Sequence, residues 1–374
     1  ITMGPVTPDQ RAWLNPLVRT YAVLVALVDT WGAEVEALAV SRNGASLETN
    51  PVDVHRATDA VLAGVDRVAW QCPNVTFVAT TNRRLGVDAA ILFSDILTPL
   101  DGLGLGLEFH PAPVFAKPLR TPAAIDALVL PPPAENAAQV FAAIAGLRAA
   151  LPPETPLIGF AGAPFTLFCY LVEGHGSKGF FLAKSFLFSE PAAADRLLDK
   201  LATQTVAYLT AQAAAGAQAL MIFDSWAGLL APDTYARHAL PAVRRVLAGL
   251  RPLGLPLIYF PNQGATLLDQ LPGLPLDVAG IDWRLPLSRA RAILGPGIAV
   301  QGNLDPAALM APPAELLHLA DRVLAEAGTA PGHIFNLGHG IEPATDPDQV
   351  ARLVDYVHER TATGATFRGS GGRP

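Results

Sequence analysis

Cysteine is scarce in this sequence. Among its 374 residues only Cys72 and Cys169 carry a thiol. A disulfide framework needs several paired cysteines, and a thiolate zinc site needs cysteine or histidine ligands at short spacings. Two isolated cysteines provide neither. The sequence therefore predicts no disulfide scaffold and no metal site, and the reducing cytoplasm is the expected compartment.

Charge is sparse as well. Charged residues make up 16% of the chain, the formal net charge is −7, and lysine and arginine form no cluster. Nucleic-acid binding depends on a basic patch, so we expect no nucleic-acid partner. The apolar stretch Tyr21–Val28 ends at Asp29 and is too short to span a bilayer, so we expect no membrane partner. A polyanionic small molecule stays compatible with this charge, because a few local arginines can bind one.

Motifs for the common cofactors are missing. The glycine-rich stretch Gly102–Gly106 lacks the Gly-x-Gly-x-x-Gly spacing of a dinucleotide site, and no Gly-x-x-x-x-Gly-Lys-Ser/Thr phosphate loop occurs. The Gly-x-Ser-x-Gly motif of the α/β-hydrolases is absent too. These absences argue against a dinucleotide site, a phosphate loop and an α/β-hydrolase.

Apolar residues are abundant, at 51% of the chain, and from Ala89 onward they form short runs between longer amphipathic stretches. Continuous apolar runs bounded by Gly, Pro or Asp are typical of strands that are buried on both faces of a parallel sheet. Seven runs fit this description: Ala89–Phe93, Leu157–Ala161, Ala219–Phe223, Leu257–Phe260, Val278–Ile281, Ile298–Gln301 and His333–Leu337.

Helices are predicted between these strands. One begins at Pro191 and runs to about Ala215, another begins after Asp346 and ends near Glu359, and Ser288 is expected to cap a short one. Regular alternation of strands and helices defines an α/β fold. Because no polar, edge-like strand follows the apolar ones, we expect a closed (β/α)₈ TIM barrel whose first strand is uncertain.

The first 82 residues lack this pattern. Tyr21–Val40 is a plausible helix, and Arg67–Gln71 is a better candidate for the first strand than Val75–Ala79, which leaves no room for a crossover helix before Ala89. We expect an atypical segment over residues 1–82, the barrel over 83–360, and a disordered Gly/Ser/Arg-rich tail over 361–374.

Reactive groups of such barrels lie at the carboxyl ends of the strands. This rule selects eleven residues: Ser94, Asp95, Thr166, Tyr170, Asp224, Ser225, Asp282, Asn303, Asp305, Asn336 and His339. Structural alternatives remain open, because Asp95, Ser225 and Asp305 could be helix N-caps and Tyr170 could be a core aromatic. The glycines on both sides of His339 leave its imidazole open to a ligand.

Six segments in order and spacing resemble the uroporphyrinogen decarboxylase family, from Arg83 to about Glu359. They are Leu85-Gly-Val-Asp-Ala-Ala-Ile-Leu-Phe-Ser-Asp-Ile-Leu97, Gly159-Phe-Ala-Gly-Ala-Pro-Phe-Thr-Leu167 with Tyr170-Leu-Val-Glu-Gly174, Phe223-Asp-Ser-Trp-Ala-Gly228, Gly280-Ile-Asp-Trp283, Gln301-Gly-Asn-Leu-Asp-Pro306 and Phe335-Asn-Leu-Gly-His-Gly-Ile341.

The resemblance implies a barrel enzyme, usually a homodimer, that needs no metal or cofactor. It implies removal of carbon dioxide from the four acetate side chains of uroporphyrinogen III, which gives coproporphyrinogen III. Matched residue by residue, it places the pyrrole-binding and catalytic aspartate on Asp95, and substrate-binding roles on Tyr170, Ser225 and His339.

One family motif has no counterpart here. The family carries Met-Arg-Gln-Ala-Gly-Arg on its first strand, and no arginine among residues 1–82 lies in a matching frame. We hypothesise that this segment is substituted or frame-shifted. An active decarboxylase, a family barrel that binds tetrapyrrole with impaired or no catalysis, and a methyltransferase of the wider superfamily are the three interpretations. The last needs a thiolate zinc site, against which the cysteine count argues.

Overall fold

The structure is a computed structural model that describes residues 21–22, 78–79, 82–92, 95–109, 113–342 and 344–362. Its centre is a parallel sheet of eight strands in the order β1-β10-β9-β8-β7-β6-β5-β2. The strands are β1 (Tyr21–Ala22), β2 (Ala90–Ile91), β5 (Leu157–Gly162), β6 (Ala219–Asp224), β7 (Leu257–Pro261), β8 (Val278–Gly280), β9 (Ala299–Gln301) and β10 (His333–Phe335). From β2 to β10 the strands follow one another in chain order. The predicted α/β barrel class and its seven apolar strands are thereby confirmed.

The strand at Tyr21–Ala22 corrects the prediction of a helix that begins at Tyr21. These two residues pair in parallel with Ile334 and Phe335 of β10. A short apolar run suits a buried strand as well as a buried helix, so its pattern alone does not separate the two. The predictions for Arg67–Gln71 and Ser94, and for the tail beyond residue 362, lie outside the described residues.

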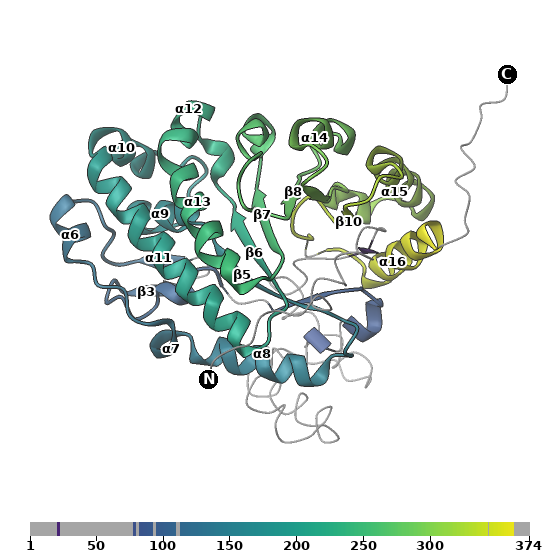
Figure 1. Ribbon diagram of the computed structural model, residues 1–374, viewed down its shortest axis with the longest axis horizontal. Helices are drawn as coiled ribbons and strands as arrows, with labels where there is room; N and C mark the ends of the chain where they lie inside the picture. The colour runs from purple at the N-terminus through teal and green to yellow at the C-terminus, as the bar shows by residue number, and fades with distance from the viewer. Residues whose placement is uncertain are drawn as a thin grey trace, which may run out of the picture.

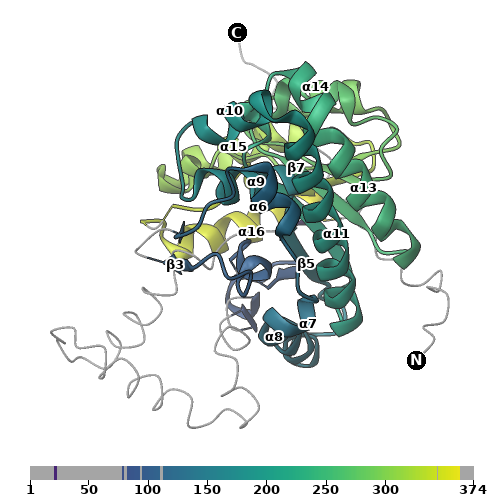
Figure 2. The ribbon, with the colours of Figure 1, turned by 90° about the vertical axis from the view of Figure 1, so that its left-hand side faces the viewer.

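Helices cover the outer face of the sheet (Figure 1). They are α6 (Pro122–Ala127), α7 (Pro133–Asn136), α8 (Ala138–Ala150), α9 (Pro164–Glu173), α10 (Phe181–Ser189), α11 (Pro191–Ala215), α12 (Pro232–Thr234), α13 (Leu240–Leu250), α14 (Leu287–Leu294), α15 (Pro313–Ala327) and α16 (Pro347–Thr361). Short helical turns are η2 (Thr98–Leu100), η3 (Ala227–Leu229), η4 (Tyr235–Ala239, a π-helix), η5 (Arg251–Leu253), η6 (Gly264–Thr266), η7 (Leu268–Gln270) and η8 (Pro306–Met310). A hairpin of β3 (Leu107–Phe109) and β4 (Pro113–Phe115) stands apart from the sheet. Helices α9, α11 and α13 lie side by side, as the view turned by 90° also shows (Figure 2).

Two of the predicted helix boundaries are confirmed and one is wrong. Helix α11 has the predicted bounds, and the Asp346 side chain caps α16 by accepting the Asp348 N–H at 2.9 Å. Helix α14, in contrast, begins at Leu287, so Ser288 lies inside its first turn and is not its cap. The fully buried Leu287 anchors the start of the helix, and the Ser288 hydroxyl binds Glu326 instead.

The interior of the barrel is filled by apolar side chains. Strand alternation points Ile158 and Phe160 inward, where they pack with Met221, Ile258 and Ile334, while the larger hydrophobic cluster lies between strands and helices. Each fully buried side chain of this size contributes roughly 1.5–3 kcal/mol to folding. A filled interior leaves the carboxyl ends of the strands as the place for a ligand.

Candidate active site

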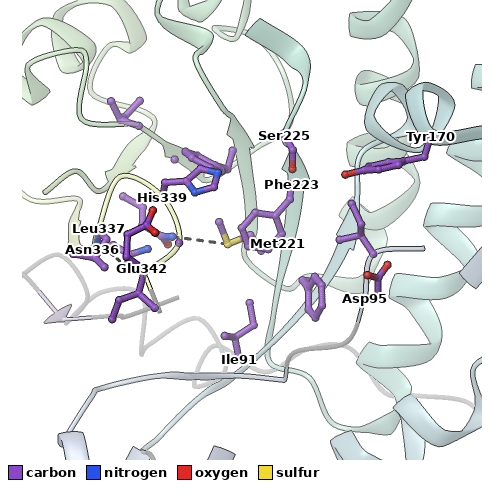
Figure 3. Close-up of a pocket in the computed structure, with 18 of the residues that line it drawn as sticks. Ile91, Asp95, Tyr170, Met221, Phe223, Ser225, Asn336, Leu337, His339 and Glu342 are labelled. Atoms are coloured by element: carbon purple, nitrogen blue, oxygen red, sulfur yellow. Dashed lines mark hydrogen bonds between the residues drawn. The ribbon is translucent and has the colours of Figure 1, made fainter. Parts of the chain in front are cut away.

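A cavity of about 530 Å³ opens at the carboxyl ends of the strands. All four residues predicted to form the site line it: Asp95, Tyr170, Ser225 and His339 (Figure 3). They come from four places in the chain, since Asp95 follows β2, Tyr170 is on α9, Ser225 follows β6 and His339 follows β10. The other walls are mostly apolar and include Ile91, Phe160, Met221, Phe223, Phe260 and Leu337.

Asp95 is half-buried at the edge of the cavity. Its Oδ1 accepts the Leu97 N–H at 2.7 Å and so closes the turn before η2. Asp95 thus accepts a backbone N–H as an N-cap residue would, although Leu97 occupies the cap position of η2. Its Oδ2 has no hydrogen-bond partner among the described residues. Burial raises the pKa of Asp95, and the Leu97 N–H opposes that rise. The result is a carboxyl group with one oxygen free to accept a hydrogen bond from a ligand.

Tyr170 is held by two other aromatic rings. Its ring centroid lies 5.5 Å from that of Phe180 and 6.3 Å from that of Trp226, both in edge-on geometry. Phe180 and Trp226 are themselves 4.7 Å apart. Figure 3 shows the Tyr170 hydroxyl pointing into the cavity above Asp95. Burial raises the pKa of Tyr170, so at neutral pH this hydroxyl is a hydrogen-bond donor.

His339 lies in a loop that packs tightly on Trp283. A Cβ at Gly338 would come within 2.5 Å of the Trp283 backbone nitrogen, so only glycine fits before the histidine. The imidazole centroid is 6.5 Å from each of the Phe260 and Trp283 rings. Burial and the nearby Arg284 guanidinium lower the pKa of His339. The ring is therefore neutral at neutral pH and can donate one hydrogen bond and accept another.

Ser225 lies in the turn that follows β6. Its carbonyl oxygen accepts from the Asn262 side chain at 3.3 Å, and its hydroxyl faces the cavity. The predicted N-cap role goes unfilled, because Trp226 occupies the cap position of η3 and makes no side-chain cap hydrogen bond. Ser225 is thus placed as a ligand-facing hydroxyl.

Other strand-end residues have structural roles. Asp305 caps η8 by accepting the Ala307 N–H at 3.0 Å, as the N-cap alternative predicted. Asn303 donates to the carbonyls of Asp282 and Leu285, and Asp282 accepts the Arg284 N–H at 2.8 Å. These side chains hold loops in place and do not line the cavity.

The sequence prediction missed two polar side chains that line the cavity, those of Gln301 and Glu342. Gln301 ends β9 and is 2% exposed. Its Nε2 is 3.8 Å from the Met221 sulfur, and its Oε1 has no hydrogen-bond partner among the residues that the structure describes. Period-two alternation along β9 could have identified Gln301 as inward-facing. Glu342 lies in the loop after His339, and no sequence signal distinguishes it from an exposed acid.

Charge in the cavity is acidic. Among the described lining residues Asp95 and Glu342 carry carboxyl groups, and none is lysine or arginine. No group of His, Cys, Asp and Glu in the described part of the chain is arranged to hold a metal ion. Across the same residues, no helix is long and apolar enough to cross a bilayer. Between its apolar walls the cavity presents a carboxylate acceptor at Asp95, hydroxyl groups at Tyr170 and Ser225, and the His339 imidazole.

Comparison with known proteins identifies the family of this chain. The family model described as uroporphyrinogen decarboxylase matches residues 75–360. A protein of that name from Citrifermentans bemidjiense is 44% identical over 325 residues, covering 84% of this chain and 96% of the relative. Another, from Syntrophotalea carbinolica, is 48% identical over 277 residues, covering 74% and 81%.

Solved structures resemble the chain at the level of the fold. A methyltransferase from Methanosarcina mazei superposes with a TM-score of 0.71 at 16% identity, covering 94% of this chain and 98% of that one. A B12-independent methionine synthase from a Shewanella species superposes with a TM-score of 0.53 at 11% identity, covering 76% and 85%. Identities this low show a shared barrel and carry no argument about the reaction.

Proposed function

The chain belongs to the uroporphyrinogen decarboxylase family, and from this premise we propose how its cavity performs the reaction. The reaction is decarboxylation in tetrapyrrole biosynthesis: carbon dioxide leaves the four acetate side chains of uroporphyrinogen III and coproporphyrinogen III remains. Each step replaces the lost carboxylate with a proton. The methyltransferase interpretation has only the shared fold in its favour.

Asp95 is the centre of the proposed mechanism. Loss of carbon dioxide leaves an electron pair that needs a sink, and a pyrrole ring protonated on the adjacent carbon is a cationic sink. The free oxygen of Asp95 would accept the pyrrole N–H and stabilise the developing positive charge. A preorganised group of this kind is worth on the order of 3 kcal/mol in the transition state. This free, half-buried carboxylate oxygen is the observation that carries the proposal.

The remaining site residues would orient the macrocycle. The hydroxyls of Tyr170 and Ser225 can donate to substrate carboxylates, and neutral His339 can donate one ring N–H. Holding the acetate arm in a reactive geometry lowers the entropic part of the barrier. The walls formed by Phe160, Phe223 and Phe260 offer apolar surface to the pyrrole rings.

Anaerobic turnover of uroporphyrinogen tests this function. Purified protein should convert it to coproporphyrinogen, with products separated by porphyrin chromatography after oxidation. Asp95→Ala should abolish most of this turnover, and wild-type activity in that variant would refute the role of Asp95. Tight binding of substrate by the unaltered chain without turnover would favour the alternative of a family barrel that binds tetrapyrrole but does not decarboxylate it.

We also propose that the protein is a homodimer in the cytoplasm. The exposed apolar side chains of α10 support a dimer: Phe181 is 75% exposed, Phe188 63% and Leu182 49%. Exposed apolar groups gathered on one helix are typical of an interface. Sedimentation should show a dimer that Phe181→Ser weakens, and a monomer at all concentrations would refute it. The low cysteine content supports the compartment, which cell fractionation tests.

A further inference from the structure

Asp224 is a buried acid that the proposed mechanism does not use. It is the last residue of β6, its exposed fraction is 0%, and it does not line the cavity. No ion pair in the described part of the chain includes it. A buried carboxyl without a cationic partner is costly, so its hydrogen bonds have to offset the lost hydration.

Those hydrogen bonds all run toward the carboxylate. Oδ1 accepts from the Thr166 hydroxyl at 2.8 Å and Oδ2 accepts from the Tyr259 hydroxyl at 2.8 Å. Because the Tyr259 hydroxyl donates its proton to Asp224, it can only accept in its 2.9 Å contact with the Tyr235 hydroxyl. Tyr235 is therefore the donor of that hydrogen bond. The Thr166 hydroxyl oxygen in turn accepts the backbone N–H of Trp226 at 3.3 Å. Every hydroxyl proton of this network has one acceptor.

The network joins two walls of the active site. Thr166 and Tyr170 are four residues apart on α9 and so lie on the same face of that helix. Ser225 and Trp226 follow Asp224 directly, and the Trp226 ring packs on Tyr170. We propose that Asp224 is a positioning residue: through Thr166 it fixes Tyr170 and Ser225 in the spacing that binds substrate. This inference rests on the proposed roles of Tyr170 and Ser225.

Asp224 is also the group in this network that titrates near neutral pH. Burial raises its pKa to about 6, against the lowering effect of the Tyr259 and Thr166 hydrogen bonds. The titratable groups that face it are Tyr259 on β7, Tyr235 in η4 and Cys169 on α9, and burial raises the pKa of each. All three stay neutral while Asp224 gains a proton. Protonation removes one acceptor and should loosen the link between α9 and the turn after β6.

Asp224→Asn tests the proposal at nearly constant shape. The amide group cannot accept at both positions, so either Thr166 or the Tyr259–Tyr235 pair loses an acceptor. We expect KM for uroporphyrinogen at pH 7.5 to rise about tenfold, the scale of one lost buried hydrogen bond, with a smaller change in kcat. We also expect the wild-type rise in KM below about pH 6 to be missing from the variant.

Thr166 supplies a second, independent variant. Thr166→Val removes the hydroxyl and should reproduce the KM of Asp224→Asn, whereas Thr166→Ser keeps it and should restore KM to within about threefold of wild type. Asp305→Asn, the same chemical change at a helix cap outside the site, is the matched control and should leave KM unaltered. Wild-type KM and pH dependence in both Asp224→Asn and Thr166→Val, with only the melting temperature lowered, would overturn the proposal.

Binding separates this inference from the proposed function. Uroporphyrin, the oxidised macrocycle, can be titrated against tryptophan fluorescence without turnover. If the wild-type chain lacks decarboxylase activity, the proposed function fails, yet Asp224→Asn should still weaken uroporphyrin binding about tenfold relative to Asp305→Asn. Equal binding by these two variants refutes the positioning role in either case.

Discussion

Replacing Asp95 by asparagine removes one negative charge and little else. The amide oxygen can keep the 2.7 Å hydrogen bond from the Leu97 N–H, so the turn before η2 should persist. What is lost is the charge on the oxygen that faces the cavity. Because the group is half-buried, its interaction with a cation is much less screened than in bulk water.

The magnitude follows from that geometry. Two unit charges about 4 Å apart interact by roughly 4 kcal/mol at the effective dielectric constant near a protein surface. Removal of one preorganised group from other active sites costs about 2.7–4 kcal/mol, or a rate factor of about 10² to 10³. We therefore expect Asp95→Asn to lower kcat about a hundredfold. Asp95→Ala also loses the acceptor oxygen and should fall further, toward a thousandfold.

The assay is the initial rate of anaerobic decarboxylation at saturating uroporphyrinogen. Asp346→Asn, a change of the α16 cap far from the cavity, is the matched control and should retain the wild-type rate. Burial raises the pKa of Asp95, so the wild-type rate should fall as acid protonates it, and this limb should vanish in Asp95→Asn. A rate for Asp95→Asn within threefold of wild type would refute the reasoning, because no uncharged acceptor stabilises a pyrrole cation equally well.

Three further outcomes can be checked. Phe168 is fully buried, so Phe168→Ala should lower the free energy of unfolding, measured in urea, by about 3–5 kcal/mol. Phe181 is exposed, so Phe181→Ser should change the free energy of unfolding of the monomer by less than about 0.5 kcal/mol. Arg284→Leu removes a cation that lowers the pKa of His339, so NMR titration should find that pKa raised; a lower one contradicts the assignment. Burial raises the pKa of Asp224 from 3.8 to about 6, so the folded state binds a proton at Asp224 more tightly than the unfolded state does. Protonation of Asp224 should therefore add about 3 kcal/mol to the free energy of unfolding below pH 4, and this addition should be lost as pH rises through 6. Denaturation of Asp224→Asn should show a flatter pH profile, and an unchanged slope argues against the shift.

The strands and most of the site could be predicted because their signals are local. A continuous apolar run identifies a buried strand wherever its partners lie, and the carboxyl end of a parallel strand is where barrel chemistry occurs. Asp305 and Asp346 each precede a proline, which is a cap signature that needs no tertiary information. Local signals of this kind placed Asp95, Tyr170, Ser225 and His339 among eleven strand-end candidates, and the family resemblance then selected these four.

The predictions that failed or were missed concern residues whose structure depends on contacts between segments distant in the sequence. Ser288 is a preferred N-cap residue type, yet the burial of Leu287 moves the start of α14 ahead of it. Tyr21–Ala22 forms a strand because β10 lies beside it, which no pattern within residues 21–40 reveals. Gln301 follows the alternation of β9, but that alternation does not say that one face borders a cavity.

The charges around the cavity set the orientation of the proposed substrate. Asp95 would repel an acetate carboxylate and attract a pyrrole N–H, so the nitrogen face of the macrocycle belongs next to β2. Arg284 lies behind the opposite wall: its guanidinium carbon is 4.0 Å from the centroid of the Trp283 ring beside His339, and its Nη1 is 3.5 Å from Asp282 Oδ1. A carboxylate arm is therefore best accommodated toward β10, where Arg284 offsets its charge and neutral His339 donates a hydrogen bond. Arg284→Leu should then raise KM for uroporphyrinogen while leaving the rate loss of Asp95→Asn unchanged, because the two groups act on opposite ends of the ring.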